Sequence, residues 1–232
     1  MITHFLKIKQ LLNLFFPKQC INCNREGSFL CEDCLSLIEI NNFQYCLCEK
    51  LEKNNKCENC KNKYLDKVFS ATSFKNKIIK KAIHKLKYSY IKELSVPLAY
   101  LMIRHLQVID CQINNDFFLV PVPLSDKKKR TRGFNQSEEI AKIISEVTGL
   151  PLLNCVKKIK DTKSQTEMKK NQRQENVKNV FFINENVENK NIILIDDVYT
   201  TGATMEEVAK KLKESKANIV WGITVARETV DL

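Results

Sequence analysis

Short apolar runs alternate along this chain with longer segments in which apolar residues recur every three or four positions. The runs predict strands at Val68–Phe74, Phe117–Val120, Leu152–Lys158, Val180–Ile183, Ile192–Ile195 and Asn218–Val225. The periodic segments predict helices at Lys77–Tyr88, Lys92–Leu106 and Met205–Ser215, and one between Asn135 and Gly149. Strands that alternate with helices favour an α/β fold built on a parallel sheet.

The stretch from Ile192 to Thr204 carries the strongest indication of chemistry. It reads as a strand buried on both faces, then two carboxylates, then a turn rich in hydroxyls and glycine that leads into a helix. Carboxylates accept hydrogen bonds from sugar hydroxyls or hold Mg²⁺, and helix N-termini bind anions. The pattern therefore predicts a sugar-phosphate site, although acids after a strand can also simply cap a loop. Its candidate residues are Asp196, Asp197, Thr200, Thr201, Gly202, Ala203 and Thr204.

Two basic segments are candidates for the other side of this site. The segment Pro123–Phe134 is predicted to be a loop after another strand end, and its cations Lys129, Arg130 and Arg132 could neutralise a pyrophosphate in the same crevice. Further along, Lys163, Lys169, Lys170 and Arg173 could form a hood over it. The alternative for both segments is a solvated basic surface.

Eight of the ten cysteines lie between positions 20 and 60, in four closely spaced pairs. Two-residue spacers let a tight turn direct two thiolates at one ion, so the first four cysteines predict a closed, structural zinc site. A second zinc site is predicted from the last four, where the one-residue spacer between Cys46 and Cys48 is unfavourable. Sequential pairing gives Cys20, Cys23, Cys31 and Cys34 for the first ion and Cys46, Cys48, Cys57 and Cys60 for the second; interleaved pairing and a disulfide scaffold are the alternatives.

The first 16 residues have the apolar spacing of an amphipathic helix, interrupted by lysines. We expect it to pack on the body of the protein, with peripheral membrane contact as the alternative, and we expect no secretory signal and no transmembrane segment. The formal net charge of +11 favours polyanionic or phosphorylated partners, although a biased genome also produces lysine-rich chains.

Several motifs together resemble a known family. The run Leu194–Thr204 is similar to the phosphoribosyl pyrophosphate (PRPP) motif of type I phosphoribosyltransferases. The segments Val120–Leu124, Arg132–Gln136 and Gln165–Val177, together with the cysteine module, resemble the ComF/GntX family of competence proteins over nearly the whole chain. The chain departs from the family at the third cysteine pair, and at Lys87–Tyr90, where the expected glycine is missing.

The resemblance implies a Rossmann-like parallel sheet of the type I phosphoribosyltransferase class behind a double zinc ribbon. We expect the amphipathic helix to span residues 1–17, with the zinc ribbons over 18–64 and the phosphoribosyltransferase-like domain over 65–232. Asp196 and Asp197 would hold the PRPP ribose with Mg²⁺, and Thr200–Thr204 its 5-phosphate. The expected setting is the cytoplasm, in the uptake of DNA.

Three functions remain open from the sequence. The first is a PRPP-binding factor that handles incoming single-stranded DNA, with DNA-uptake proteins as partners. The second is an active phosphoribosyltransferase, for which no acceptor and no catalytic residue can be named. The third is a zinc-ribbon adaptor whose PRPP site is vestigial.

Overall fold

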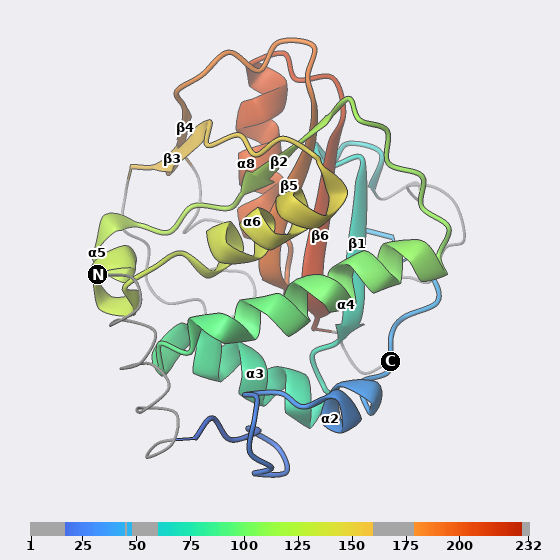
Figure 1. The fold of residues 1–232 in the computed structure, drawn as a ribbon. Helices are drawn as coiled ribbons and strands as arrows, with labels where there is room; N and C mark the ends of the chain where they lie inside the picture. The colour runs from blue at the N-terminus through green and yellow to red at the C-terminus, as the bar shows by residue number, and fades with distance from the viewer. Residues whose placement is uncertain (1–16, 45, 48–59, 160–178, 229–232) are drawn as a thin grey trace.

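The protein is described by a computed structural model that covers residues 17–44, 46, 47, 60–159 and 179–228. Four parallel strands form the central sheet in the order β1-β6-β5-β2 (Figure 1). Their bounds are Lys67–Ser73 for β1, Phe117–Pro121 for β2, Asn191–Tyr199 for β5 and Val220–Arg227 for β6. The parallel α/β sheet predicted from the alternation of strands and helices is confirmed.

The last strand of the described chain lies inside the sheet, between β1 and β5. One row of residues shows the register, since Val68 pairs with Gly222, Gly222 with Leu194, and Leu194 with Val120. Beyond β2 the chain adds one parallel bridge, from Leu119 to Leu152. The predicted strand Leu152–Lys158 is therefore only that bridge followed by a short strand, β3 (Val156–Lys158), which pairs antiparallel with β4 (Phe181–Ile183).

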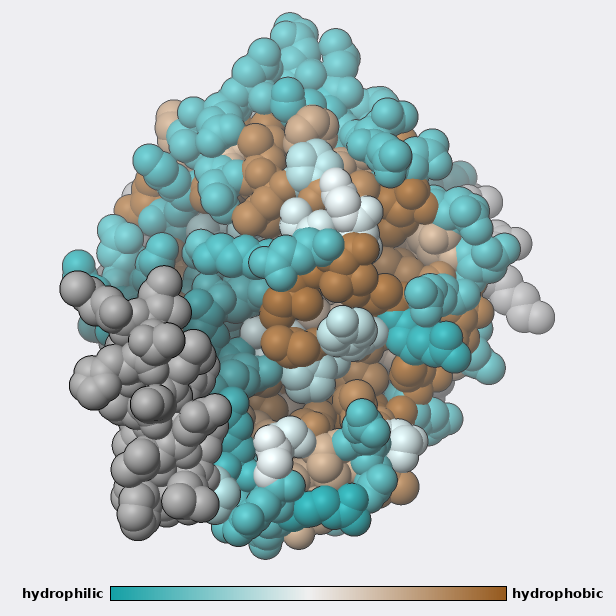
Figure 2. Space-filling model, in the orientation of Figure 1, coloured by the Kyte–Doolittle hydropathy of each residue, from teal (hydrophilic) through white to brown (hydrophobic). Residues whose placement is uncertain are grey.

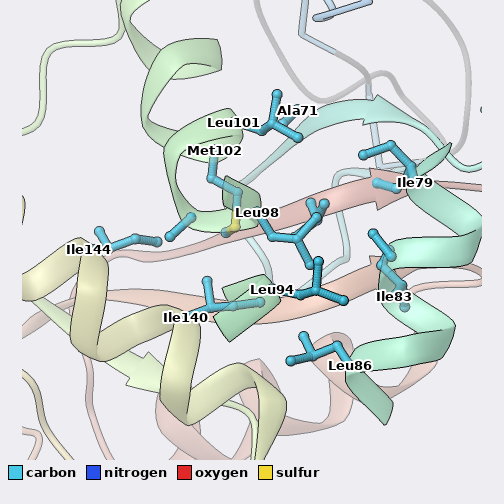
Figure 3. Close-up of a cluster of buried hydrophobic side chains, with 14 of the residues drawn as sticks. Ala71, Ile79, Ile83, Leu86, Leu94, Leu98, Leu101, Met102, Ile140 and Ile144 are labelled. Carbon is cyan, nitrogen blue, oxygen red and sulfur yellow. The ribbon is translucent and has the colours of Figure 1, made fainter. Parts of the chain in front are cut away.

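Three helices and a short 3₁₀ turn cover one face of the sheet. They are α3 (Lys77–Tyr88), η2 (Lys92–Leu94), α4 (Ser95–Val108) and α6 (Gln136–Thr148). Their apolar stripes meet in one buried cluster, in which Leu94 and Leu98 lie between Leu86 and Ile140 (Figure 3). Figure 2 shows this side of the molecule, with hydrophobic side chains gathered near its centre and hydrophilic ones above and below. The four helical segments predicted from periodicity are all helical; α3 has its predicted ends, and the ends of α4 and α8 are shifted by one to three residues.

The opposite face of the sheet is covered by α8 (Ala203–Glu214) and the β3–β4 hairpin. Val208 and Leu212 of α8 are fully buried there with Ile192 and Leu194 of β5. Residues on alternate positions of β5, Ile193 and Ile195, belong to the other buried cluster. The strand is thus buried on both faces, as its unbroken apolar run predicts.

Two local predictions were wrong. The segment predicted as a loop after β2 contains a helix, α5 (Asp126–Arg132), whose N-cap Ser125 accepts a hydrogen bond from the Lys128 N–H. A serine cap and an acidic first residue stabilise a helix start, and these outweigh the repulsion among its cations. The strand β5 also runs four residues beyond Ile195, so Asp196 and Asp197 lie within the strand and do not follow it.

The cysteine-rich segment packs on the same cluster as the helices. Cys20, Ile21, Leu30 and Ile38 are buried with residues of α3 and α4, and the short helix α2 (Glu32–Ser36) lies between them in sequence. Asn41 then lies against the outer edge of β1, where its N–H donates to the Ala71 carbonyl and its side chain to the Ser70 carbonyl. Polar cover of this kind protects an edge strand from pairing with another chain.

Two predictions lie outside the described residues. The expected amphipathic helix falls almost entirely on residues 1–16, and the expected hood cations Lys163, Lys169, Lys170 and Arg173 fall on residues 160–178. Among the residues that are described, no helix is both long and apolar enough to cross a membrane.

Candidate functional site

The predicted carboxylate pair lies at the carboxyl end of β5, where parallel α/β sheets place their ligands. Asp197 is buried, whereas Asp196 is partly exposed. Oδ1 of Asp196 accepts a hydrogen bond of 2.9 Å from the backbone N–H of Asp197, which fixes one carboxylate relative to the other. Neighbouring strands hold the backbone here, because Asp196 pairs in register with Thr224 of β6.

A lysine from the end of α3 contacts the second carboxylate. Lys87 Nζ lies 2.9 Å from Oδ1 and 2.9 Å from Oδ2 of Asp197. The helix is oriented for this contact by Asn76, whose side chain caps its first turn by accepting from the Ile78 and Ile79 N–H groups, and by its buried stripe. Lys87 was not predicted as a site residue, since a lysine on an amphipathic helix is ordinarily solvated.

A serine from α6 contacts the first carboxylate. Ser137 Oγ donates to Asp196 Oδ1 at 2.9 Å. Its position follows from the cap of α6, where Asn135 Oδ1 accepts from the Ser137 N–H and Asn135 Nδ2 donates to the Val122 carbonyl. The predicted N-cap at Asn135 is therefore confirmed. It also ties the helix that carries Ser137 to the segment directly after β2.

The two carboxylates differ in their electrostatic environment. Although Asp196 is partly exposed, the surrounding protein desolvates its carboxyl group, and this desolvation and the neighbouring Asp197 carboxylate raise its pKa to about 7. Lys87, the Asp197 N–H and Ser137 act in the opposite direction. A carboxyl group that titrates near neutral pH in a cleft is a common mark of a functional site. It can accept or donate a hydrogen bond near neutral pH, depending on its protonation state.

The predicted phosphate turn follows directly. Gly202 has φ of 74° and is the N-cap of α8, so the chain turns there into the helix. A small hollow of about 20 Å³ lies between the turn and the strand, lined by Asp196, Val198, Tyr199, Thr200, Gly202, Ala203, Thr204 and Met205. Backbone N–H groups in the first turn of a helix have no partner within the helix and attract anions. Six of the seven predicted site residues line this hollow or the larger cleft beside it; Thr201 lines neither.

The larger cleft, of about 240 Å³, joins the carboxylates to a basic wall. Lys87, Lys128 and Arg132 are its cationic lining residues near α3 and α5. Arg132 is held by a 3.0 Å hydrogen bond to Gln136 Oε1 and lies 5.2 Å from the centre of the Tyr88 ring. Of the predicted pyrophosphate-binding cations, Arg132 therefore reaches the cleft. Lys129 and Arg130 do not line it, and Lys129 pairs instead with Glu138 at 3.8 Å.

The first cysteine cluster has the geometry of a metal site. The Sγ atoms of Cys20, Cys23, Cys31 and Cys34 all lie within 4.8 Å of one another. A tetrahedral zinc site with Zn–S bonds of about 2.3 Å needs sulfur atoms about 3.8 Å apart, so the four thiols fit this ion. Burial opposes ionisation of Cys20, but the backbone N–H groups of Cys23, Cys31 and Asn22 lower its pKa to about 6. The cluster can therefore bind a metal such as zinc, and four thiolates leave no position open for catalysis.

The second cysteine cluster is only partly described. Cys46 and Cys60 are both buried on the α8 face of the sheet, whereas Cys48 and Cys57 lie outside the described residues. Next to Cys46, the Leu47 carbonyl accepts a hydrogen bond of 3.4 Å from the Tyr199 hydroxyl. The second zinc site stays a prediction, and the segment expected to hold it contacts the residue just before the phosphate turn.

Comparison with known proteins agrees with this arrangement. The phosphoribosyl transferase domain profile matches residues 90–229, which is more than half of the chain. Competence protein F of Haemophilus influenzae is 32% identical over 114 residues, and competence protein ComFC of Bacillus subtilis is 38% identical over 112 residues. These matches cover 47% and 48% of this chain and 50% and 45% of those proteins, so the chain spans about half the length of each. Competence protein ComFC of Streptococcus pneumoniae is 30% identical over 221 residues, covering 87% of this chain and 89% of that protein.

The parallel sheet, the carboxylates at the end of β5 and the matched domain define a protein of the phosphoribosyltransferase fold class. The cysteine cluster in front of that domain and the near full-length similarity to ComFC then specify it further. The chain belongs to the ComF family.

Proposed function

We propose that this protein binds PRPP in the cleft beside Asp196 and Asp197, and that it acts on incoming single-stranded DNA during natural transformation. The observation that carries the first part is the meeting of two carboxylates, a phosphate-type turn and a basic wall in one cleft. PRPP has the matching groups, since it combines ribose hydroxyls, a 5-phosphate and a pyrophosphate.

Each part of PRPP has a candidate partner. Asp196 and Asp197 would accept hydrogen bonds from the ribose hydroxyls, and the turn Thr200–Thr204 would take the 5-phosphate. Lys128 and Arg132 lie on the side where the pyrophosphate would extend. Carboxylate and hydroxyl oxygens suit Mg²⁺, which would neutralise part of the pyrophosphate charge.

The names of the relatives support the second part. Three similar proteins are described as competence proteins, and a net charge of +11 suits a polyanionic partner. The proposal places the protein in the cytoplasm, where thiols stay reduced and available to zinc.

Calorimetric titration with PRPP and Mg²⁺ tests the ligand. We expect saturable binding to the unaltered protein and loss of binding in the double variant Asp196→Asn with Asp197→Asn. A matched control replaces Asp110 and Asp116 by Asn, because these acids flank the amino end of β2, away from the cleft, and the charge change is equal. Equal PRPP affinity in both double variants would contradict the proposed site.

Two further measurements separate the remaining functions. Release of pyrophosphate from PRPP in the presence of one of a panel of nucleobases would identify an active phosphoribosyltransferase, whereas binding without release supports a binding role. Normal transformation in a competent host that carries the folded double carboxylate variant would show that the PRPP site is vestigial.

A further inference from the structure

The exposed face of α3 is the most uniformly basic surface among the described helices of at least two turns. The helix carries five lysines and a histidine and contains no acidic residue; its basic residues are Lys77, Lys80, Lys81, His84, Lys85 and Lys87. A helix of this composition repels itself at low ionic strength, because like charges three and four residues apart destabilise it. Its buried stripe of Ile79, Ile83 and Leu86 holds it in place despite this repulsion.

The lysines of α3 differ in their ion pairs from the lysines on the opposite face of the sheet. Within the described part of the chain, no carboxylate forms an ion pair with Lys77, Lys80, Lys81 or Lys85. The contrast is with α8 and the turn after it, where Lys210 and Lys211 pair with Glu214 and Lys216 pairs with Glu188. Among the described residues, ion pairs therefore do not neutralise the charge of these four lysines, and that charge is available to a polyanion.

Aromatic side chains lie along the same face. A groove of about 460 Å³ is lined by Phe74, His84 and Tyr88 together with four lysines of the helix, Lys77, Lys80, Lys81 and Lys87. The His84 and Tyr88 rings are 4.9 Å apart, and Lys80 Nζ lies 5.6 Å from the centre of the Phe74 ring. Tyr88 remains 52% exposed although Arg132 and His84 contact its ring, so part of the ring is open to a ligand.

This groove is continuous with the carboxylate cleft. Phe74, Lys87 and Tyr88 line both hollows, and beyond them Arg132 and Lys128 extend the basic lining along α5. A ligand that follows α3 therefore arrives at Lys87, which contacts Asp197.

We propose that the α3 groove, made of Lys77, Lys80, Lys81, His84 and Tyr88 with Phe74, is the binding track for single-stranded DNA, and that the strand leads to the PRPP cleft. The proposal rests on the proposed function and assigns it a surface. The lysines would contact backbone phosphates, and the Tyr88 and His84 rings would stack on bases. This combination of cations and aromatic platforms is what sequence-tolerant single-strand binding requires.

The chemistry favours a single strand over a duplex. Bases of a duplex are stacked on one another and cannot lie flat on Tyr88, whereas bases of a single strand can. The helix of 12 residues is about 18 Å long at 1.5 Å per residue. An extended single strand spaces its phosphates more widely than a duplex does, so a track of this length spans only a few nucleotides.

Fluorescence anisotropy with a labelled oligothymidylate, titrated at several salt concentrations, tests the track. The variant Lys77→Gln with Lys80→Gln and Lys81→Gln removes three phosphate contacts. We expect it to bind more weakly and to reduce the slope of log affinity against log salt by about 2, since each contact contributes about 0.7 for single strands. A fourfold rise in salt would then lower the affinity of the unaltered protein by a factor about sixteen times larger than the factor by which it lowers the affinity of the variant.

The matched control replaces Lys210, Lys211 and Lys216 by Gln. It removes the same charge from the helix on the opposite face of the sheet and from the turn after it, so it should leave the slope nearly unchanged. Two single variants provide a second measurement, because Tyr88→Phe keeps the stacking surface and should keep the affinity, whereas Tyr88→Ala should lower it about fivefold or more.

The outcomes distinguish the two proposals. Equal slopes in the two lysine variants, or equal affinity of Tyr88→Ala and Tyr88→Phe, would overturn the α3 track while DNA binding itself persists. Absence of oligothymidylate binding by the unaltered protein at low salt would instead overturn the DNA-handling function on which the track depends.

Discussion

Lys87 Nζ lies 2.9 Å from each carboxylate oxygen of Asp197, across the gap between the end of α3 and the end of β5. The pair is largely removed from solvent, with 21% of the lysine side chain and 9% of the aspartate side chain exposed. The ammonium group of Lys87 contacts the Asp197 carboxylate, which PRPP would need as the acceptor for a ribose hydroxyl or as a ligand for Mg²⁺. Ligand binding must therefore share or displace this contact, which links the position of α3 to the state of the cleft.

Replacing Lys87 by Met should destabilise the protein. The substitution leaves a buried carboxylate without its cation, and we expect the free energy of unfolding to fall by about 1–3 kcal/mol at neutral pH. It should also raise the pKa of Asp196 further above about 7, because Lys87 is one of the groups that lower it. Urea denaturation and a carboxyl titration by NMR measure the two effects.

A double-mutant cycle isolates the pair. Lys87→Met combined with Asp197→Asn should cost less stability than the sum of the two single changes, because the charge left alone by one change is removed by the other. Additive losses would show that the two side chains do not interact.

The stability of the protein should fall as pH rises through the range set by Asp196. Its pKa is raised from 3.8 to about 7 in the folded state, so between these values the folded protein keeps a proton that the unfolded chain has lost. The stabilisation from this group is fully present below pH about 4 and is lost as pH approaches about 7. Asp196→Asn has no such proton, and its Oδ1 can still accept from Ser137.

The variant Asp196→Asn should therefore gain stability relative to the unaltered protein as pH rises. We expect a difference of about 1–3 kcal/mol in favour of the variant at pH 8, and less at pH 5, from parallel urea titrations. The comparison between the two proteins cancels the titration of groups that do not interact with Asp196. A difference that does not change with pH would contradict the raised pKa of Asp196.

Much of the fold follows from sequence because the informative patterns are local. The apolar run Ile192–Ile195 identifies a strand buried on both faces, and the periodicity of Lys77–Tyr88 gives α3 with the same bounds as the structure. Helix α5 was missed because its sequence is almost entirely charged and has no apolar stripe. Only the cap at Ser125 and the left-handed Gly133, with φ of 72°, indicate its two ends.

The candidate site is less predictable because it depends on tertiary placement. The residues from Asp196 to Thr204 are contiguous and form a recognisable motif, whereas Lys87 and Ser137 come from α3 and α6 and reach the carboxylates only in the folded chain. Spacing along the sequence contains no information about such contacts. Arg132 was predicted from its position after β2, but which of the predicted cations Lys129, Arg130 and Arg132 reaches the cleft depends on the helical form of α5.

Removal of the metal ion from the first cysteine cluster should destabilise the folded protein. We expect at least one zinc per chain, and loss of one zinc in Cys34→Ser, with the free energy of unfolding lowered by about 3 kcal/mol or more. The reason is that Cys20 and Cys31 of this cluster are buried with the helices α3 and α4. Cys111→Ser is the control, since Cys111 lies outside the cluster. Unchanged zinc content in Cys34→Ser would exclude a four-thiolate site here, and two zinc ions per chain would support the second predicted site.

Gly202 should tolerate no side chain, for two separable reasons. Its φ of 74° is strained for any residue with a Cβ, and a Cβ at this position would meet the Tyr199 hydroxyl and ring. Gly149 provides the matched control, because its φ is 75° and nothing lies within 4 Å of an added Cβ. We expect Gly149→Ala to cost about 1 kcal/mol, the backbone cost alone, and Gly202→Ala to cost at least about 2 kcal/mol.

Because the displaced Tyr199 is followed directly by the phosphate turn, Gly202→Ala should also lose PRPP affinity in the calorimetric titration, whereas Gly149→Ala should keep it. Equal losses of stability in the two variants would mean that Tyr199 yields freely, and the turn would then not be held in the shape that the proposed phosphate site requires.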